Sequence, residues 1–289
     1  MTSLELYNLL LRRLAEGGLN VSEAEAEAVL IIGRFSGLGR SDIFLHTRRR
    51  LLPEVSSQIM AALEERLRTR RPLAYILGEQ EFWGRSFAVS EAVLIPRPET
   101  EILIEEVLRQ FPVPASACGP RQPLFLDLGT GSGIIAVTLA MELPWMRGLA
   151  LDLEYSALLQ ARENARRLRA ERLEFVQADW HSAFIHERRF SLVTANPPYV
   201  AAEVMDSLQP ELRHEPLAAL DGGKDGVEEI KRLTDGLPEI ISPGGWFFME
   251  IGYDQEDYVR QLFKGSKYER VMVHRDYAGL PRVLQAQVR

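Results

Sequence analysis

From Leu124 onward the sequence alternates between short apolar runs typical of strands and longer amphipathic runs typical of helices. Alternation of this kind predicts a parallel, doubly wound sheet with helices on both faces. The last two strand-like runs, YERVMVH and RVLQAQV, are separated only by a short turn around Gly279–Pro281. Because so short a link joins only antiparallel strands, we expect an α/β, Rossmann-like sheet whose last strand is antiparallel.

The residues before this sheet follow a helical pattern. In SLELYNLLLRRLAE the apolar residues recur with a helical period. A second helix is expected after Ser22, with Glu25 completing a capping box, and a third begins at Pro53. These patterns predict a small N-terminal helical bundle.

Shorter signals mark the connections. The run QEFWGRSFAVS predicts two short strands around Gly84, a β-hairpin. We therefore expect a helical domain over 1–72, a linker with the hairpin over 73–95, and the sheet domain over 96–289. Within the sheet domain, VEEIKRLTDGLPEII is expected to be one helix.

Composition narrows the class of protein. The 289 residues carry a net charge of −7, which argues against a main affinity for nucleic-acid phosphates. Cys118 is the only cysteine, so the chain cannot form an internal disulfide, which suits a reducing compartment. The N-terminus lacks a signal-peptide pattern, and no apolar run is long enough to span a membrane. We expect a cytoplasmic protein with no membrane partner.

A glycine-rich loop, LDLGTGSG, lies between the first strand of the sheet domain and the helix that follows this strand. Its spacing does not fit a dinucleotide fingerprint, because position 134 is Ile, and the Gly-Lys of a phosphate loop is absent. It resembles motif I of class I methyltransferases, which implies S-adenosyl-L-methionine as cofactor. The loop residues expected to bind it are Asp127, Gly129, Thr130, Gly131, Ser132 and Gly133.

The next two strands end in further candidates for the cofactor site. Asp152 follows Gly133 by nineteen residues, and its carboxylate can accept hydrogen bonds from both ribose hydroxyls. At the end of the third strand, Asp179 could accept from the adenine amino group and Trp180 could lie against the ring. An ordinary strand-end acid and a packed core Trp are the alternatives for these positions.

The fourth strand ends in NPPY, an unusual combination. Two prolines remove two backbone donors and stiffen an extended chain, so that Asn196 sits on a rigid platform. The side-chain oxygen of Asn196 and the carbonyl of Pro197 could hold the NH₂ group of a planar amide. Pro198 and the flat ring of Tyr199 would contact the same planar group. The motif resembles motif IV of methyltransferases that modify planar nitrogens.

Five longer segments distinguish among those enzymes: EFWGRSFAVSEAVLIPRPETE, NPPYV, HEPLAALDGGKDG, MEIGYDQ and DYAGLPRVL. Together they resemble the protein-(glutamine-N5) methyltransferases, the PrmC/HemK family, over essentially the full chain. The resemblance implies methylation of the glutamine in the Gly-Gly-Gln motif of class 1 peptide chain release factors. It also places Arg97 and Glu99 near the pocket mouth, and implies that the helical domain holds the release factor.

Two other functions stay open. A nucleic-acid amino-methyltransferase acting on adenine or guanine could use Asn196 in the same way, but it would need a basic face. A binding module on an idle methyltransferase fold is disfavoured by the intact Asp152, glycine loop and NPPY. No His or Cys spacing predicts a metal site, and we read His181 and His186 as surface residues. We expect a monomer that does not bind nucleic acid directly.

Overall fold

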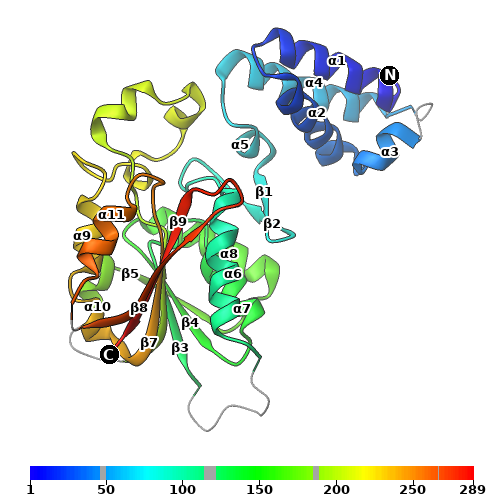
Figure 1. The fold of residues 1–289 in the computed structure, drawn as a ribbon. Coiled ribbons are helices and arrows are strands. Elements are labelled where there is room, and N and C mark those ends of the chain that lie inside the picture. Colours follow the sequence, from blue (N-terminus) through cyan, green and yellow to red (C-terminus); the bar gives the residue numbers. More distant parts are fainter. Residues whose placement is uncertain (46–49, 114–121, 185–188, 266) are drawn as a thin grey trace. The chain divides into compact units, whose positions relative to one another are not determined.

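The computed structural model describes residues 1–45, 50–113, 122–184, 189–265 and 267–289 (Figure 1). Cys118 and His186 lie outside these residues. The chain forms two compact units, one containing Met1–Gly78 with Pro210–His214, the other Glu79–Gln209 with Glu215–Arg289. In the described part of the chain no helix has both the length and the apolar character needed to cross a membrane.

The first unit is helical. Its helices are α1 (Ser3–Glu16), α2 (Val21–Ser36), α3 (Arg40–Leu45), α4 (Pro53–Thr69) and α5 (Leu73–Leu77). They enclose a core of buried side chains from every helix, among them Leu10, Ile31, Ile43, Leu63 and Leu73. The expected helical bundle is thus confirmed.

The start of α2 differs from the prediction. Asn20, and not Ser22, caps this helix: its side chain accepts from the backbone N–H of Glu23 at 3.0 Å. Glu23, and not Glu25, completes the capping box by accepting from the N–H of Asn20. Asn and Ser cap helices about equally well, so the choice depends on where the helix begins, which is two residues earlier than expected.

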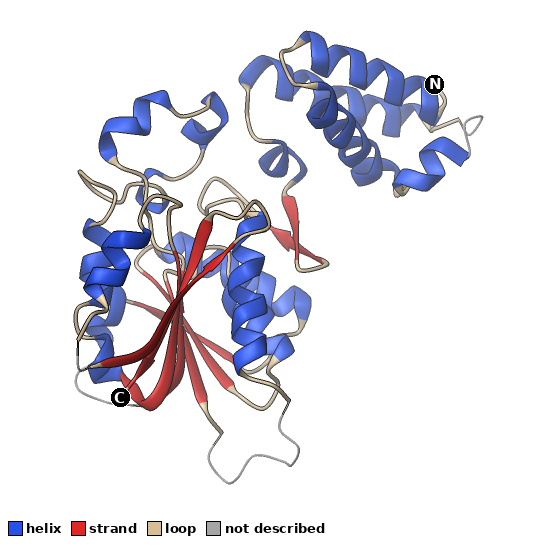
Figure 2. Ribbon diagram, viewed as in Figure 1, coloured by secondary structure: helices blue, strands red, loops and turns tan. Residues whose placement is uncertain are grey.

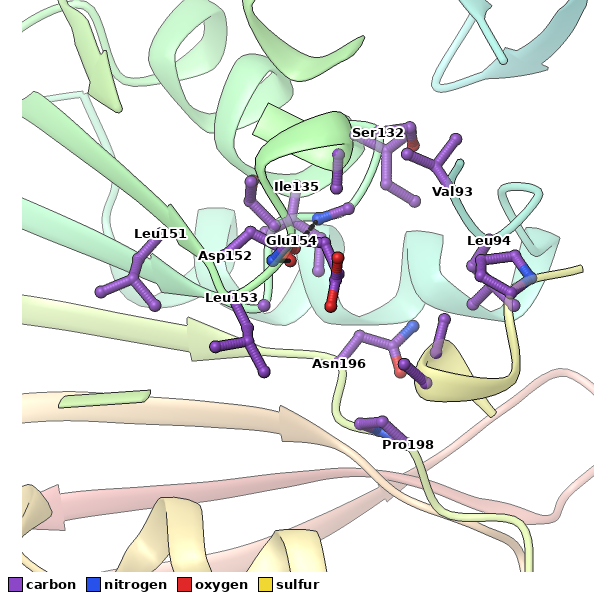
Figure 3. A pocket seen from close by; sticks show the side chains of 18 of the residues that line it. Val93, Leu94, Ser132, Ile135, Leu151, Asp152, Leu153, Glu154, Asn196 and Pro198 are labelled. Carbon is purple, nitrogen blue, oxygen red and sulfur yellow. Dashed lines mark hydrogen bonds between the residues drawn. The ribbon is translucent and has the colours of Figure 1, made fainter. Parts of the chain in front are cut away.

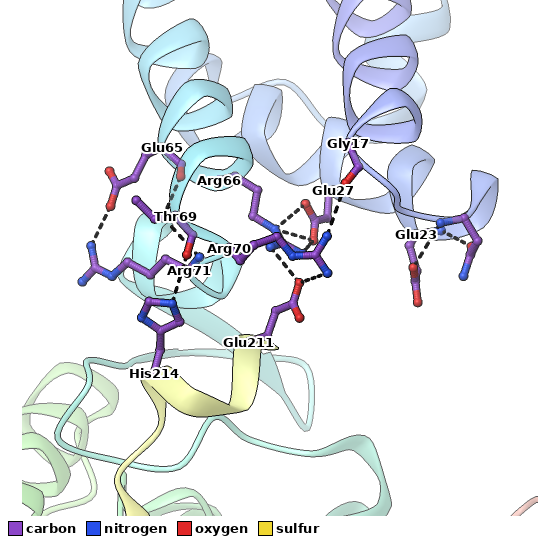
Figure 4. Close-up of polar contacts among 11 residues, drawn as sticks. Gly17, Glu23, Glu27, Glu65, Arg66, Thr69, Arg70, Arg71, Glu211 and His214 are labelled. Carbon is purple, nitrogen blue, oxygen red and sulfur yellow. Dashed lines mark hydrogen bonds and ion pairs between the residues drawn. The ribbon is translucent and has the colours of Figure 1, made fainter. Parts of the chain in front are cut away.

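A buried cluster of charges joins the 3₁₀ segment η4 (Pro210–His214) to α4 (Figure 4). Arg66, 5% exposed, pairs with Glu27 and with Glu211, each at 3.0 Å. Arg70 pairs with the same Glu211 oxygen at 2.8 Å. Burial raises the pKa of Glu27, while hydrogen bonding to Arg66 lowers it. A short segment more than a hundred residues downstream in the chain is therefore held to the helical unit by charged hydrogen bonds.

The second unit begins with the predicted hairpin, formed by β1 (Glu79–Phe82) and β2 (Arg85–Ala88). Its two turn residues, Trp83 and Gly84, have φ of 52° and 65°. Positive φ at both central positions is the geometry of a two-residue turn that matches strand twist. Asn164 hydrogen-bonds to both the N–H and the carbonyl of Ala88 and so fixes the hairpin to this unit.

The main sheet has seven strands in the order β5-β4-β3-β6-β7-β9-β8. They are β3 (Leu124–Leu128), β4 (Arg147–Asp152), β5 (Leu173–Gln177), β6 (Phe190–Ala195), β7 (Ile241–Glu250), β8 (Tyr268–Arg275) and β9 (Pro281–Val288). The first five in the sheet order are parallel, and β9 is antiparallel to both of its neighbours. This confirms the predicted sheet and its antiparallel last strand.

Helices cover both faces of the sheet, as Figure 2 shows. One face carries α6 (Glu101–Gln110), α7 (Ile134–Glu142) and α8 (Tyr155–Leu168). The other carries α9 (Glu228–Thr234), α10 (Leu237–Ile240) and α11 (Glu256–Leu262). Successive residues of β7 point to opposite faces of the sheet. Phe248 therefore packs in the core beneath α6 and α7, and Phe247 in the core beneath α9, α10 and α11.

The predicted helix VEEIKRLTDGLPEII is wrong as a single element. The structure divides it into α9 and α10 at Gly236, whose φ is +88°. Pro238, near the start of α10, has no N–H for a continuous helical ladder, which favours a new helix start at this place.

Candidate active site

A pocket lies at the carboxyl ends of the parallel strands (Figure 3). Its lining includes Gly129 after β3, Asp152 at the end of β4, Trp180 after β5 and Asn196 after β6. Open α/β sheets bind ligands at this edge. The structure therefore brings residues from all four predicted motifs around one cavity, although they are spread over 68 positions of the chain.

The glycine loop turns sharply from β3 into α7. Gly129, Gly131 and Gly133 have φ of 69°, 54° and 82°, values that residues with a Cβ rarely adopt. A Cβ on Gly133 would lie 3.0 Å from the Cβ of Ala161 on α8, so this glycine permits close helix packing. Gly133 does not line the pocket, whereas Gly129, Thr130, Gly131 and Ser132 do.

Asp152 lies beside the loop and holds its backbone. One carboxylate oxygen accepts from the N–H of Gly131 at 2.8 Å and the other from the N–H of Glu154 at 2.9 Å. Burial raises the pKa of Asp152, and these backbone hydrogen bonds lower it. Each oxygen keeps acceptor capacity for a further donor in the pocket.

Asp127 is 1% exposed and lies behind the loop, away from the pocket lining. Its two oxygens accept from the hydroxyls of Thr130 at 2.7 Å and Thr194 at 2.8 Å. Burial raises the pKa of Asp127 to about 7. Its observed contacts support the loop through Thr130, while its predicted direct contact with a cofactor stays a prediction.

Asp179 and Trp180 form another part of the pocket wall. The Asp179 carboxylate is paired with Arg232 at 2.7 Å and its side chain is 47% exposed. The Trp180 indole N–H donates to Glu229 at 2.9 Å, which fixes the ring from its polar edge. A planar group that entered here would meet the apolar ring and a carboxylate that already has a partner.

The NPPY segment supplies the pocket's amide. Asn196 and Pro198 line the cavity, while Pro197 is buried and Tyr199 is partly buried. The Nδ2 atom of Asn196 donates to Glu250 at 3.0 Å, and the Tyr199 hydroxyl donates to the other Glu250 oxygen at 3.3 Å. Burial raises the pKa of Tyr199, which therefore stays a neutral donor.

The IPRPETE segment also reaches the pocket, through Arg97 and Thr100. Arg97 lines the cavity and pairs with Glu215 at 2.5 Å, and Glu215 also accepts from the backbone N–H of Ile95. Glu99 is exposed and does not line the pocket. The next residue, Thr100, lines it and donates its hydroxyl to Glu250 at 2.6 Å.

Sequence reasoning thus missed Thr100, Glu215 and Glu250. Glu250 ends an apolar strand in the run MEIG, as Asp152 ends β4, and Asn196 directly follows β6. That shared position was the available signal. Among the described residues no group of three or more His, Cys, Asp or Glu side chains could hold a metal ion.

Two family models match the chain. Residues 104–222 match the methyltransferase small domain, and residues 5–78 match the PrmC N-terminal domain. A release factor glutamine methyltransferase of Koribacter versatilis is 38% identical over 287 residues, covering 98% of each chain. One of Caulobacter vibrioides is 37% identical over 274 residues, covering 94% of this chain and 91% of the relative.

This chain belongs to the release factor glutamine methyltransferase family. The sequence resemblance to this family is thereby confirmed. Among solved structures, the hMettl16 catalytic domain in complex with MAT2A 3'UTR hairpin 1 is similar, with a TM-score of 0.51 at 13% identity. The match covers 82% of this chain and 80% of that one, and it shows a shared methyltransferase fold alone.

Proposed function

We propose that this family member transfers a methyl group from S-adenosyl-L-methionine to the side-chain nitrogen (N5) of a glutamine. The substrate glutamine is that of the Gly-Gly-Gln motif in class 1 peptide chain release factors. The observation that carries the proposal is the position of Asn196, whose side-chain amide lines the same pocket as the glycine loop. Relatives named for this activity, similar over nearly the whole chain, support it.

The residues present fit an adenosyl cofactor. Gly129 and Gly131 leave the loop without side chains where it lines the pocket, and Asp152 has acceptor capacity beyond its two backbone bonds. Asp152 would hold the ribose hydroxyls, and Trp180 would lie along the adenine ring. When bound, the cofactor supplies an electrophilic sulfonium methyl group.

The chain's own residues would prepare the nucleophile. An amide nitrogen is a weak nucleophile because its lone pair is delocalised into the carbonyl. The Asn196 oxygen and the Pro197 carbonyl would each accept one N–H of the glutamine amide, which orients the nitrogen. The same two acceptors stabilise the positive charge that builds on nitrogen as the new bond forms. Tyr199 would present its ring to the planar group.

Selection of the release factor is assigned to the N-terminal helical unit, expected over 1–72 and here taken to Gly78 because α5 belongs to its core. The methyltransferase domain, expected over 96–289 after the 73–95 linker, carries the chemistry. A glutamine side chain is small, so binding energy from remote contacts must deliver it. The expected partner is the release factor itself, met in the cytoplasm by a monomer. Arg97 is assigned to substrate binding at the pocket mouth, where it is paired with Glu215. Glu99 is exposed and outside the lining, and its contact with the substrate stays a prediction.

A parallel methyl-transfer assay tests the proposal. Tritiated S-adenosylmethionine is supplied with purified release factor, with a release factor whose Gly-Gly-Gln glutamine is changed to alanine, with DNA and with ribosomal RNA. Label only on the unchanged release factor supports the proposal. Label on DNA or RNA instead supports the nucleic-acid amino-methyltransferase alternative, which the net charge of −7 disfavours.

A further inference from the structure

The orientation of the Asn196 side chain is set by two neighbouring residues, Glu250 and Thr100. Its Nδ2 atom lies 3.0 Å from Glu250 Oε2 and 3.3 Å from Thr100 Oγ1. An amide nitrogen has two N–H groups and its oxygen only accepts. Thr100 Oγ1 and Glu250 Oε2 lie only 2.6 Å apart, so the Nδ2 side of the amide faces both acceptors, while Oδ1 has no hydrogen-bond partner among the described residues.

Burial raises the pKa of Glu250, while the hydrogen bonds from Thr100 and Tyr199 and the charge of Arg282 lower it. The donors around Glu250 set the direction of these hydrogen bonds. Thr100 donates its only hydroxyl proton to Glu250 at 2.6 Å, so its oxygen can only accept from Asn196. Glu250 receives three donors, from Thr100, Asn196 and Tyr199, on two oxygens. Three converging donors suit a carboxylate, which only accepts. Turning the Asn196 amide over would place its oxygen against the Glu250 carboxylate.

The sheet places these groups together. Residues Ala195 of β6 and Met249 of β7 are paired in the parallel register, and the next residue on each strand is Asn196 and Glu250. Thr100, at the end of η1 (Pro98–Thr100), precedes the first strand of the sheet in the sequence, and its hydroxyl contacts Glu250 at the same place. Glu250 and Thr100 are 1% and 0% exposed, so water does not compete for their hydrogen bonds.

We propose that Glu250 and Thr100 are positioning residues that lock the Asn196 amide with its oxygen toward the substrate. This inference rests on the proposed function, because it takes the group held by Asn196 to be a planar NH₂. An amide free to turn over would present a donor to that NH₂ half of the time. The lock removes this unproductive orientation before substrate enters, which is preorganisation of the kind that raises turnover.

The first test changes each positioning residue conservatively. Glu250→Gln keeps the volume but removes the all-acceptor carboxylate, and Thr100→Val removes the hydroxyl. We expect each to lower kcat about 10- to 100-fold, with KM for release factor and affinity for S-adenosylmethionine nearly unchanged. Thr100→Ser keeps the hydroxyl and should restore most of the turnover lost in Thr100→Val.

Glu106→Gln is the matched control. Glu106 is also a buried carboxylate of this unit, 8% exposed, but it pairs with Arg109 and His274 and does not line the pocket. The variant Glu106→Gln should lower the melting temperature, as Glu250→Gln does, but should leave kcat near the wild-type value. Equal losses of kcat in the two variants would overturn the inference, because stability alone would then explain them.

A double-mutant cycle with Asn196→Ala decides whether Glu250 acts through Asn196. If it does, Glu250→Gln has no further effect on single-turnover rate once Asn196 is alanine. Independent, multiplying effects overturn the inference. The proposed function fails separately, if the wild-type protein does not label release factor; the inference fails if that label forms and Glu250→Gln forms it at the wild-type rate.

Discussion

The indole ring of Trp180 lies against Gly129, so that a Cβ atom on Gly129 would sit 3.2 Å from the ring carbon Cζ3. Both residues have positive φ, 46° for Trp180 and 69° for Gly129. The contact joins the loop after β3 to the segment after β5, and both residues line the pocket. The width of the proposed adenosyl site is thus set partly by the missing side chain of Gly129.

Gly129→Ala is therefore expected to weaken S-adenosylmethionine binding about tenfold or more, because the new methyl group displaces Trp180. A residue other than glycine at this φ also costs about 1–2 kcal/mol of stability. Calorimetric titration and thermal melting measure the two effects. Gly84→Ala is the control, since Gly84 has φ of 65° in the hairpin turn with nothing within 4 Å of its would-be Cβ. Equal affinity in the two variants would contradict the prediction.

The parts of the site that could be predicted from the sequence are those formed by short, contiguous motifs. The glycine loop and NPPY each place their residue types within a few positions of a strand end, and strand ends of a parallel sheet meet at one edge. The pattern of apolar runs therefore determined both the sheet and the location of the pocket. The partition at Gly236 and the cap at Asn20 departed from the local signals.

The parts that sequence reasoning missed depend on contacts between distant residues. Glu250 is 54 residues from Asn196 and 150 from Thr100, and each pair is brought together by the order of strands, which periodicity does not encode. Glu211 reaches Arg66 across 145 residues for the same reason. Asp127 shows that motif spacing alone does not fix a residue's contacts. Its spacing matches a binding motif, but its observed hydrogen bonds are with Thr130 and Thr194.

Asp152→Ala is expected to weaken S-adenosylmethionine binding by about 1.5–3 kcal/mol, the scale of lost charge-assisted hydrogen bonds. Part of the loss comes through Gly131, whose N–H loses its acceptor. Asp152→Asn keeps one acceptor oxygen and should lose less. Asp179→Asn is the comparison, because Asp179 is half exposed and already paired with Arg232. Calorimetry that ranks Asp179→Asn above Asp152→Ala in lost affinity would reject the ribose assignment.

Asn196→Ala is expected to leave cofactor affinity almost unchanged and to lower turnover by orders of magnitude. The lost oxygen is an acceptor that acts mainly on the charge developing in the transition state. Single-turnover measurements with saturating release factor give the chemical rate directly. A rate near wild type would show that another group positions the glutamine.

Because Asp127 is buried, we expect its ionisation to make the free energy of unfolding depend on pH in one direction. Its pKa is about 7 in the folded protein against 3.8 as the reference value, so between these limits the folded state keeps a proton that the unfolded chain has lost. The free energy of unfolding therefore falls as pH rises through this window, by up to about 4 kcal/mol, and levels off above pH 7.

Asp127→Asn removes this contribution, so its stability deficit relative to wild type should shrink from pH 5 to pH 7 and stay constant above. Urea unfolding of both proteins at matched pH values measures the difference, in which the other titrating groups cancel. A deficit that stays constant from pH 5 to pH 7 would mean that Asp127 is already ionised in the folded protein over this range.

Removal of the helical unit tests its assignment to substrate selection. The structure places the cut at Glu79, because α5 contributes Leu73 and Leu77 to the helical core. We expect a chain beginning at Glu79 to keep its cofactor affinity and to lose most of its kcat/KM on intact release factor. Short Gly-Gly-Gln peptides should be poor substrates for both proteins, and nearly equally so, because they make none of the remote contacts that the helices would provide.

The decisive quantity is the activity of the full chain divided by the activity of the chain that begins at Glu79. This ratio is measured once with release factor as substrate and once with peptide, and the two values are compared. Glu211→Gln in the full chain is the control, since it breaks the pairs with Arg66 and Arg70 while keeping every helix. If substrate selection lies in the helices, the ratio is large for release factor and close to one for peptide. A ratio equally large for both substrates would mean that the helices serve only to stabilise the catalytic unit, and circular dichroism of the shortened chain would then show lost structure.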